Sequence, residues 1–134
     1  MITTDDYLNF WKKHYSHVKV PDDELTQELV SNADNTVAAV TLLLDAFGEE
    51  RDLTSGWRPV EVNKTVPGAA LRSNHTRCLA ADISDPDGDL DDWCTAHPDT
   101  LAKIGLWQEH PASTKGWCHV QIVAPKSGKR VFYP

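Results

Sequence analysis

Apolar residues recur at helical spacing through the first 50 positions, which predicts a helical N-terminal region. A first helix is expected after Thr3 or Thr4, where a capping residue precedes two aspartates and an aromatic-rich face. A second is expected from Pro21, with an interruption at 32–35, and a third from there to Gly48, a typical end residue. Apolar positions nearly surround the axis of the third helix, so we expect it to be central and buried.

From residue 51 onward, apolar residues fall in short β-prone runs separated by turn residues, with two short helical patterns between them. The expected strands lie near 53–59, 79–83, 105–107, 117–123 and 130–133. Helices followed by strands indicate an α+β fold, with N-terminal helices packed on a small antiparallel sheet. We expect a single domain over 1–134, in which 1–50 is helical scaffold without convergent chemistry and 51–134 is the sheet region that carries the functional site.

Composition and charge narrow the classes of function. The 134-residue chain is 40% hydrophobic and 8% aromatic, which is typical of a folded soluble protein. No apolar run approaches the roughly 20 residues of a membrane span. Residues 1–6 have no signal-peptide pattern, so cytoplasmic synthesis without a signal peptide is expected. The net charge of −7 argues against nucleic acid as a partner, and three cysteines without zinc-finger spacing indicate reduced, mostly buried thiols.

One stretch combines a histidine and a carboxylate around the pattern of a buried strand. His75 stands just before the apolar run 79–83, and Asp82 lies seven residues after His75. His119 lies in a second β-prone run, and two adjacent strands would bring the three side chains together. Two imidazoles and a carboxylate, with a fourth position open, match a catalytic zinc site. The alternative from spacing alone is that the histidines are structural residues and that Asp82 caps a turn.

Two other patterns favour structural interpretations. Asp85–Asp89 is similar to a calcium loop, but its glycine is misplaced and no glutamate closes it, so we expect a turn with an acidic helix cap. Cys118 stands beside His119. Neighbours on a strand point to opposite faces, which argues against a cysteine nucleophile at this position.

Five short motifs follow one another between Ser55 and Ile122. They are Ser55-Gly56-Trp57-Arg58-Pro59, Asn63, Pro67-Gly68-Ala69, Ser73-x-His75-x6-Asp82-Ile83 and Trp117-x-His119-Val120. This ordered set resembles the zinc D-Ala-D-Ala carboxypeptidases of peptidase family M15, a group that includes phage endolysins and shares its fold with the Hedgehog signalling domain. The resemblance covers about half of the chain.

The resemblance implies roles for individual residues. His75, Asp82 and His119 are implied as zinc ligands, in agreement with their spacing. Arg58 is implied to position a substrate carboxylate or carbonyl, a task suited to a guanidinium group, with a structural salt bridge as the alternative. Ser73 is implied to bind substrate or to orient His75.

The chain departs from the family pattern where the catalytic base is expected. Family members carry a glutamate three residues, or a histidine two residues, before the last ligand, and here these positions hold Gly116 and Trp117. Glu109 is the nearest acid upstream, and it is expected to act as general base if the chain between it and His119 forms a hairpin. His110 is the alternative base, and either residue could instead be a solvated loop residue.

The resemblance implies a zinc-dependent peptidase of peptidoglycan stem peptides, either a D-Ala-D-Ala carboxypeptidase or an endolysin-type endopeptidase, with Zn²⁺ as its cofactor. It is compatible with a phage-encoded protein that acts on the host cell wall after release or as part of a virion. The alternative is a non-catalytic zinc-binding phage structural or interaction module, which Gly116, Trp117 and the acidic charge favour. A metal-free binding module is the third hypothesis.

Cys78 replaces the glycine that the family carries three residues after the first histidine, which is a lesser departure from the family pattern.

Overall fold

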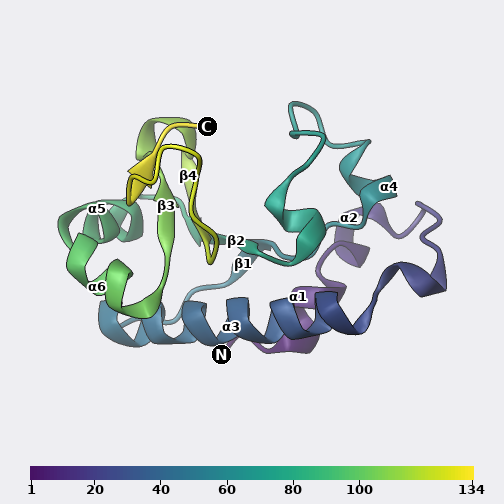
Figure 1. Cartoon of the computed structure of the whole chain (residues 1–134), viewed down its shortest axis with the longest axis horizontal. Helices are drawn as coiled ribbons and strands as arrows, with labels where there is room; N and C mark the ends of the chain where they lie inside the picture. The colour runs from purple at the N-terminus through teal and green to yellow at the C-terminus, as the bar shows by residue number, and fades with distance from the viewer.

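The computed structural model describes all 134 residues, as helices packed against one mixed sheet (Figure 1). The helices are α1 (Thr4–Asn9), α2 (Lys12–Tyr15), α3 (Gln27–Phe47), α4 (Val60–Asn63), α5 (Asp89–Ala96) and α6 (Pro98–Ile104). The short 3-10 helices are η1 (Asp22–Glu24), η2 (Asn74–Arg77) and η3 (Pro111–Ser113). The strands are β1 (Leu53–Ser55), β2 (Ala80–Asp85), β3 (Trp107–Glu109), β4 (Gly116–Gln121) and β5 (Val131–Phe132). The predicted α+β class is correct.

Helix α3 differs from the two helices predicted for this region. It runs unbroken through residues 32–35, where the polar residues favoured an interruption. Polar side chains in and next to this stretch form contacts outside the helix: the Asn32 amide donates to the carbonyl of Arg77, and the neighbouring Thr36 donates to that of Cys78. Leu42 is 54% exposed, so α3 covers one side of the core and is not surrounded by it.

The sheet has the order β1-β2-β4-β3-β5. Neighbouring strands from β1 to β3 pair antiparallel, as the sequence predicts. Strand β5 is the exception, because it lies on the outer edge of β3 and runs parallel to it. The segment 122–130 carries the chain from the end of β4 to this edge, and it places β5 in the same direction as β3.

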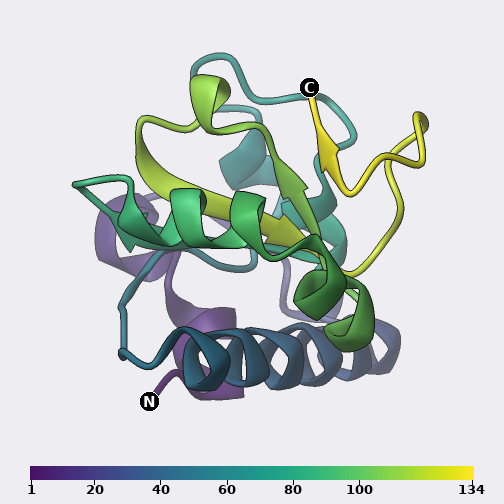
Figure 2. The ribbon, with the colours of Figure 1, turned by 90° about the vertical axis from the view of Figure 1, so that its left-hand side faces the viewer.

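The two central strands have one face in the core and one face free for chemistry. On the core face of β2 and β4, Ala81, Ile83, Cys118 and Val120 are fully buried. They pack within a core of 19 buried residues that also draws on α1, α3, α5 and α6. Figure 2 shows α3 along the opposite side of this core from the sheet. The residues that alternate with them therefore face away from α3.

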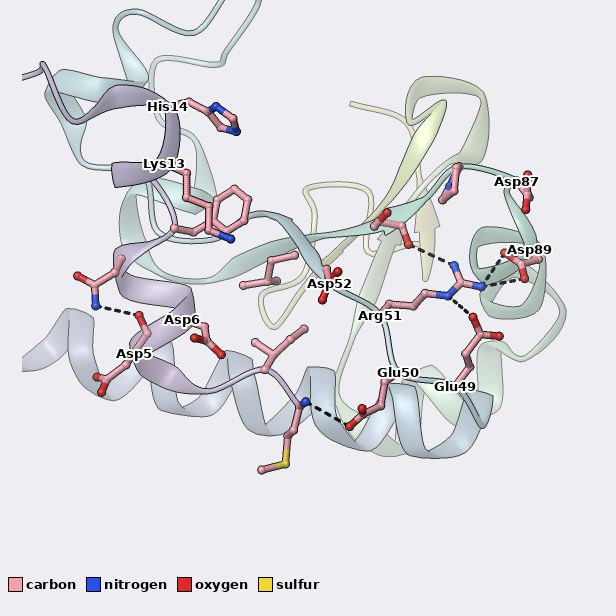
Figure 3. A pocket seen from close by; sticks show the side chains of 17 residues that line it. Asp5, Asp6, Lys13, His14, Glu49, Glu50, Arg51, Asp52, Asp87 and Asp89 are labelled. Carbon is pink, nitrogen blue, oxygen red and sulfur yellow. Dashed lines mark hydrogen bonds and ion pairs between the residues drawn. The ribbon is translucent and has the colours of Figure 1, made fainter.

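The guanidinium group of Arg51 links the end of β2 to the start of α5. Arg51 donates to Asp85 at 3.2 Å. It also donates to Asp89 at 2.8 Å and to Glu49 at 2.8 Å, and these two contacts can be followed in Figure 3. Asp85 also accepts from the backbone N–H groups of Leu90 and Asp91. The calcium-like stretch is thus a turn, and the carboxylate of Asp85 caps the start of α5, as predicted.

Several smaller predictions are also decided by the structure. The three cysteines are free and buried, as expected. Thr3 caps α1 by a reciprocal pair of hydrogen bonds with Asp6. Gly48 ends α3 with a φ of 92°, a conformation that favours glycine. No helix combines the length and the apolar character required to cross a membrane.

Candidate metal centre

Asp82 and His119 are directly opposite each other on β2 and β4. Both alternate with buried core residues, so their side chains project together from the face of the sheet that is free for chemistry. His75 joins them from η2, the turn that precedes β2. One ligand atom from each of the three side chains lies within 4.8 Å of the others. The structure thus brings together the three residues predicted as ligands.

The ring of His75 is only 3% exposed and is fixed by a backbone carbonyl. Its Nδ1 lies 2.9 Å from the carbonyl oxygen of Gly56. A carbonyl only accepts, so Nδ1 carries the hydrogen and the lone pair of the neutral ring is on Nε2. That atom lies 3.3 Å from Oδ2 of Asp82. Ser73 caps this turn by accepting from the backbone N–H of His75 at 3.2 Å, so its contact in this structure is with the turn that carries the ligand.

Two backbone features keep His75 in place. A Cβ added to Gly56 would lie 2.4 Å from the carbonyl oxygen of Tyr7, so only glycine fits at this close approach. Cys78 ends the η2 turn with a φ of 59°, in the left-handed region. Glycine adopts this conformation without strain, which gives a physical reason for the glycine that the family pattern has at this position.

The ring of His119 has a defined partner at each nitrogen. Nδ1 lies 2.8 Å from Oδ1 of Asp82, and Nε2 lies 2.9 Å from Oε1 of Gln121. The Gln121 amide is oriented in turn, because its Nε2 donates to the carbonyl of Val123 at 2.8 Å. Sequence reasoning missed Gln121. Its position two residues after His119, on the same face of a strand, was the available signal.

Asp82 and His119 each favour the charged form of the other. Burial disfavours the Asp82 carboxylate, but His75 and His119 more than offset this and hold its pKa well below the usual range. Burial also disfavours a charged His119, yet the hydrogen bond and charge of Asp82 raise the pKa of this imidazole above its ordinary value. In the metal-free protein these shifts favour an ion pair between His119 and Asp82.

The donor set suits a zinc ion. Zinc is bound by imidazole nitrogens and carboxylate oxygens at about 2.0–2.2 Å, which places neighbouring ligand atoms a few ångströms apart. The three ligand atoms here satisfy that requirement. His75 already presents a lone pair, and Gln121 can keep the hydrogen on Nε2 of His119 while its Nδ1 faces the site. Three protein ligands leave one position open, the arrangement of catalytic zinc sites.

Glu109 reaches the same face of the sheet through the β3–β4 hairpin. Trp107 pairs with Gln121 and Gln108 with Val120, and Glu109 is the next residue of β3 toward the His119 end of this register. Burial is the main cause that raises the pKa of Glu109 above its usual value; the charge of Asp82 adds to the effect, and the histidines oppose it. A half-buried carboxyl group that interacts with all three candidate ligands is well placed to exchange a proton at the site.

His110 is directed elsewhere. Its ring stacks on Tyr133 with the centroids 4.3 Å apart, and its Nδ1 accepts from the backbone N–H of Ala112 at 3.0 Å. Both contacts hold the His110 ring in the loop that follows β3. The contacts of His110 thus lie outside the candidate metal centre.

A cavity of about 220 Å³ adjoins the site on the Asp82 side. Arg58 lines it and forms no ion pair, which argues against the structural salt bridge considered for this residue. Burial is the main cause that lowers the pKa of the Arg58 guanidinium. Trp11, His14 and Tyr15 form part of the same lining. The first 50 residues, expected only as scaffold, therefore contribute a wall beside the site.

The remaining candidates lie apart from this chemistry. Cys118 is fully buried, and its pKa is raised far above the usual value by Cys94 and by burial, which argues against a nucleophilic thiol. A larger hollow of about 1200 Å³ surrounds the Arg51 contacts of Figure 3 and contains none of the predicted site residues.

The family model described as Peptidase M15 matches residues 13–110. This range is more than half of the chain, and the protein belongs to the peptidase M15 family, a family of metal-dependent peptidases. The matched range contains Arg58, His75, Asp82 and Glu109, and it ends before His119, which strand pairing brings to the same site. No curated protein and no solved structure matches the chain.

Proposed function

We propose, from its membership of the peptidase M15 family, that this protein is a zinc-dependent peptidase that hydrolyses peptidoglycan stem peptides. The reaction would be that of a D-Ala-D-Ala carboxypeptidase or of an endolysin-type endopeptidase. The proposal includes action on a bacterial cell wall, with a phage as the source of the protein. The observation that carries it is the convergence of His75, Asp82 and His119 beside a cavity lined by the unpaired guanidinium of Arg58.

The side chains of this chain divide the work of peptide hydrolysis. Zinc, when bound by the three ligands, supplies Lewis-acid polarisation of a carbonyl and lowers the pKa of a water molecule. Glu109 takes the proton of the attacking water and returns it to the leaving nitrogen. This role is supported by its position on β3, the strand paired with the one that carries His119, and by its partial burial. Arg58 holds an oxygen of the substrate, with which its fixed N–H groups can form charge-assisted hydrogen bonds.

A second candidate function is a zinc-binding module without activity. It is favoured by Gly116 and Trp117, which stand where the family carries its catalytic base and cannot carry a proton. Under this hypothesis the three ligands bind zinc and stabilise the fold, and Glu109 has no catalytic role. The two functions share the metal and differ in turnover, so an activity assay separates them.

The test incubates the zinc-loaded protein with purified sacculi of several wall chemotypes and measures the release of new peptide termini. The proposed peptidase should release them in a zinc-dependent manner, and His119→Ala, which removes a ligand, should release none. His17→Ala removes an exposed histidine outside the site, and this matched control should keep the activity. Full zinc occupancy with no release from any chemotype would contradict the peptidase and favour the binding module.

A further inference from the structure

Three residues that line the cavity beside Asp82 carry buried hydrogen-bond donors that have no partner in the protein. Five buried side-chain polar atoms lack a partner, and three of them are donors: Nε1 of Trp11, Nε1 of Trp57 and Nε of Arg58. All three residues line this one cavity, whereas Glu24 and Asn63, which supply the two unpaired acceptors, do not. Buried donors are almost always paired in proteins, so a cluster of unpaired ones indicates a site for an acceptor from outside.

The charge of the cavity defines the kind of acceptor. Arg58 forms no ion pair, and the carboxylate of Asp82, which also lines the cavity, is already engaged by the two histidines. A cation and two neutral donors together favour a carboxylate, which has two oxygens and accepts several hydrogen bonds. A volume of about 220 Å³ is small for a ligand pocket and suits one residue of a peptide.

Aromatic rings give this cavity a fixed shape. The rings of Trp11 and Trp57 meet edge to face, with their centroids 6.5 Å apart and an interplanar angle of 88°. Trp57 is 5% exposed, and its backbone N–H donates to the carbonyl of Tyr7 at 3.1 Å. Phe10 and Tyr15 complete the apolar wall. The indole groups are therefore held in place before any ligand arrives, which lowers the entropic cost of binding.

We propose that Trp11 and Trp57 are substrate-binding residues, whose indole N–H groups act with Arg58 to bind a carboxylate of the peptide beside the metal centre. The proposal rests on the proposed function, because it places part of the same substrate. It assigns a role in specificity to Trp11, which lies between α1 and α2, far from the metal ligands in the sequence. The N-terminal helices thereby complete the substrate pocket.

The test follows the indole N–H resonances of the ¹⁵N-labelled, zinc-loaded protein during titration with N-acetyl-D-alanine. N-acetyl-D-alaninamide, which lacks the carboxylate, is the matched probe. The resonances of Trp11 and Trp57 should shift with the acid and much less with the amide. Trp11→Phe keeps the ring and removes the donor, and it should weaken binding of the acid about tenfold. Trp93→Phe is the control, because Trp93 stacks on His97 outside the cavity and should leave the affinity unchanged.

The outcomes separate this inference from the proposed function. Equal affinity of the acid for the wild type and Trp11→Phe, or shifts confined to Trp107 and Trp117, would overturn the inference even if sacculi are cleaved. Carboxylate-dependent shifts of Trp11 and Trp57 would support it even if no cleavage occurs, and would then describe a binding module. The comparison of the acid with the amide uses the wild type alone, so it tests the inference even if Trp11→Phe does not fold.

Discussion

At the scale of single residues, each histidine of the candidate metal centre is oriented by a partner outside the centre. Gly56 orients His75 through a carbonyl, and Gln121 orients His119 through an amide oxygen. Such partners fix the tautomer and the direction of a histidine, and their loss typically weakens metal binding by 10–100-fold. The orientation of the two histidines, and with it the metal affinity, therefore depends on residues that do not contact the metal.

Gln121→Leu should lower the zinc affinity by about 10–100-fold, because Nε2 of His119 loses its acceptor and the ring is free to turn. Competition with a chromophoric chelator measures this change. Gln27→Leu, at an exposed position in α3, is the matched control and should bind zinc as the wild type does. Unchanged affinity in Gln121→Leu would show that the carboxylate of Asp82 alone orients the ring.

Glu109→Gln should retain zinc and the fold but lower kcat by about two orders of magnitude, because the amide cannot take the proton of the attacking water. The measurement is turnover of a stem-peptide substrate by protein of verified zinc content. Glu28→Gln, which changes an exposed glutamate of α3, should keep full activity. Wild-type turnover in Glu109→Gln together with a loss in His110→Ala would instead assign the base to the imidazole.

The metal-free protein should be most stable in mildly acidic solution. The pKa of Asp82 is below its ordinary value of 3.8, so its contribution to stability is present above about pH 4 and is lost as the pH falls through the lowered pKa. The pKa of His119 is above 6.5, so its contribution is complete below about pH 6.5 and is lost as the pH rises through the raised value. His75, Glu109 and Gln121 are the other groups that act on this pair.

Urea unfolding of metal-free protein at pH 5.5 and pH 8.5 tests this expectation. The wild type should lose stability at the higher pH relative to His119→Gln, which has no proton to lose. An identical pH dependence in the two proteins would mean that the ion pair between His119 and Asp82 contributes nothing to the stability.

The residues of the site differ in how far the sequence could predict them. His75, Asp82 and His119 could be proposed because imidazoles and carboxylates are scarce beside buried strands and carry a recognisable chemistry. Gln121 had only one weak signal, its place two residues after His119, and Trp11 had none, because an amide on a strand and an indole in a helical region are ordinary in structural roles. Only the register of β4 and the packing of the N-terminal segment give them a place near the site.

At the scale of secondary-structure elements, the close approach of β1 to the N-terminal helices positions the first ligand. Gly56 lies so close to Tyr7 that a Cβ at Gly56 would be 2.4 Å from the carbonyl oxygen of Tyr7. The same Gly56 offers its own carbonyl to His75. A backbone contact between α1 and the end of β1 is therefore linked to the orientation of a ligand on η2.

Gly56→Ala should destabilise the protein by about 1–3 kcal/mol, as overpacking does, and should weaken zinc binding because the carbonyl that fixes His75 must move. Thermal unfolding and zinc titration measure the two effects. Gly68→Ala is the control: a φ of 74° makes it costly for stability, but nothing lies near its Cβ and zinc affinity should not change. Normal zinc affinity in Gly56→Ala would separate the backbone contact from the metal site.

The elements themselves were predictable where local pattern decides them. The caps at Thr3 and Gly48, the strands β2 and β4 and the turn at Asp85 follow from local chemistry. The continuity of α3 does not, because Asn32 and its neighbours are compatible with a helix only when tertiary partners take up their side chains. The direction of β5 likewise depends on which sheet edge is free, a property of the whole sheet.

At the scale of the whole molecule, the candidate metal centre joins parts of the chain that are distant in sequence. The ligands come from η2, β2 and β4, and the cavity beside them is closed by the segment that links α1 and α2. A metal that binds only the folded arrangement stabilises all of these elements together. A metal bound at the candidate site would thus also cross-link the fold.

Removal of zinc by a chelator should therefore lower the free energy of unfolding. The loss is about 2.7 kcal/mol if free zinc had been at 100 times its dissociation constant, which corresponds to a fall in Tm of about 10 °C for a chain of this size. Calorimetry with and without chelator measures it, and restored zinc should restore the Tm. His119→Ala should show no zinc-dependent change, because a ligand is missing. An equal zinc-dependent shift in His119→Ala would mean that the stabilising metal binds elsewhere, since the loss of one of three ligands cannot leave this site intact.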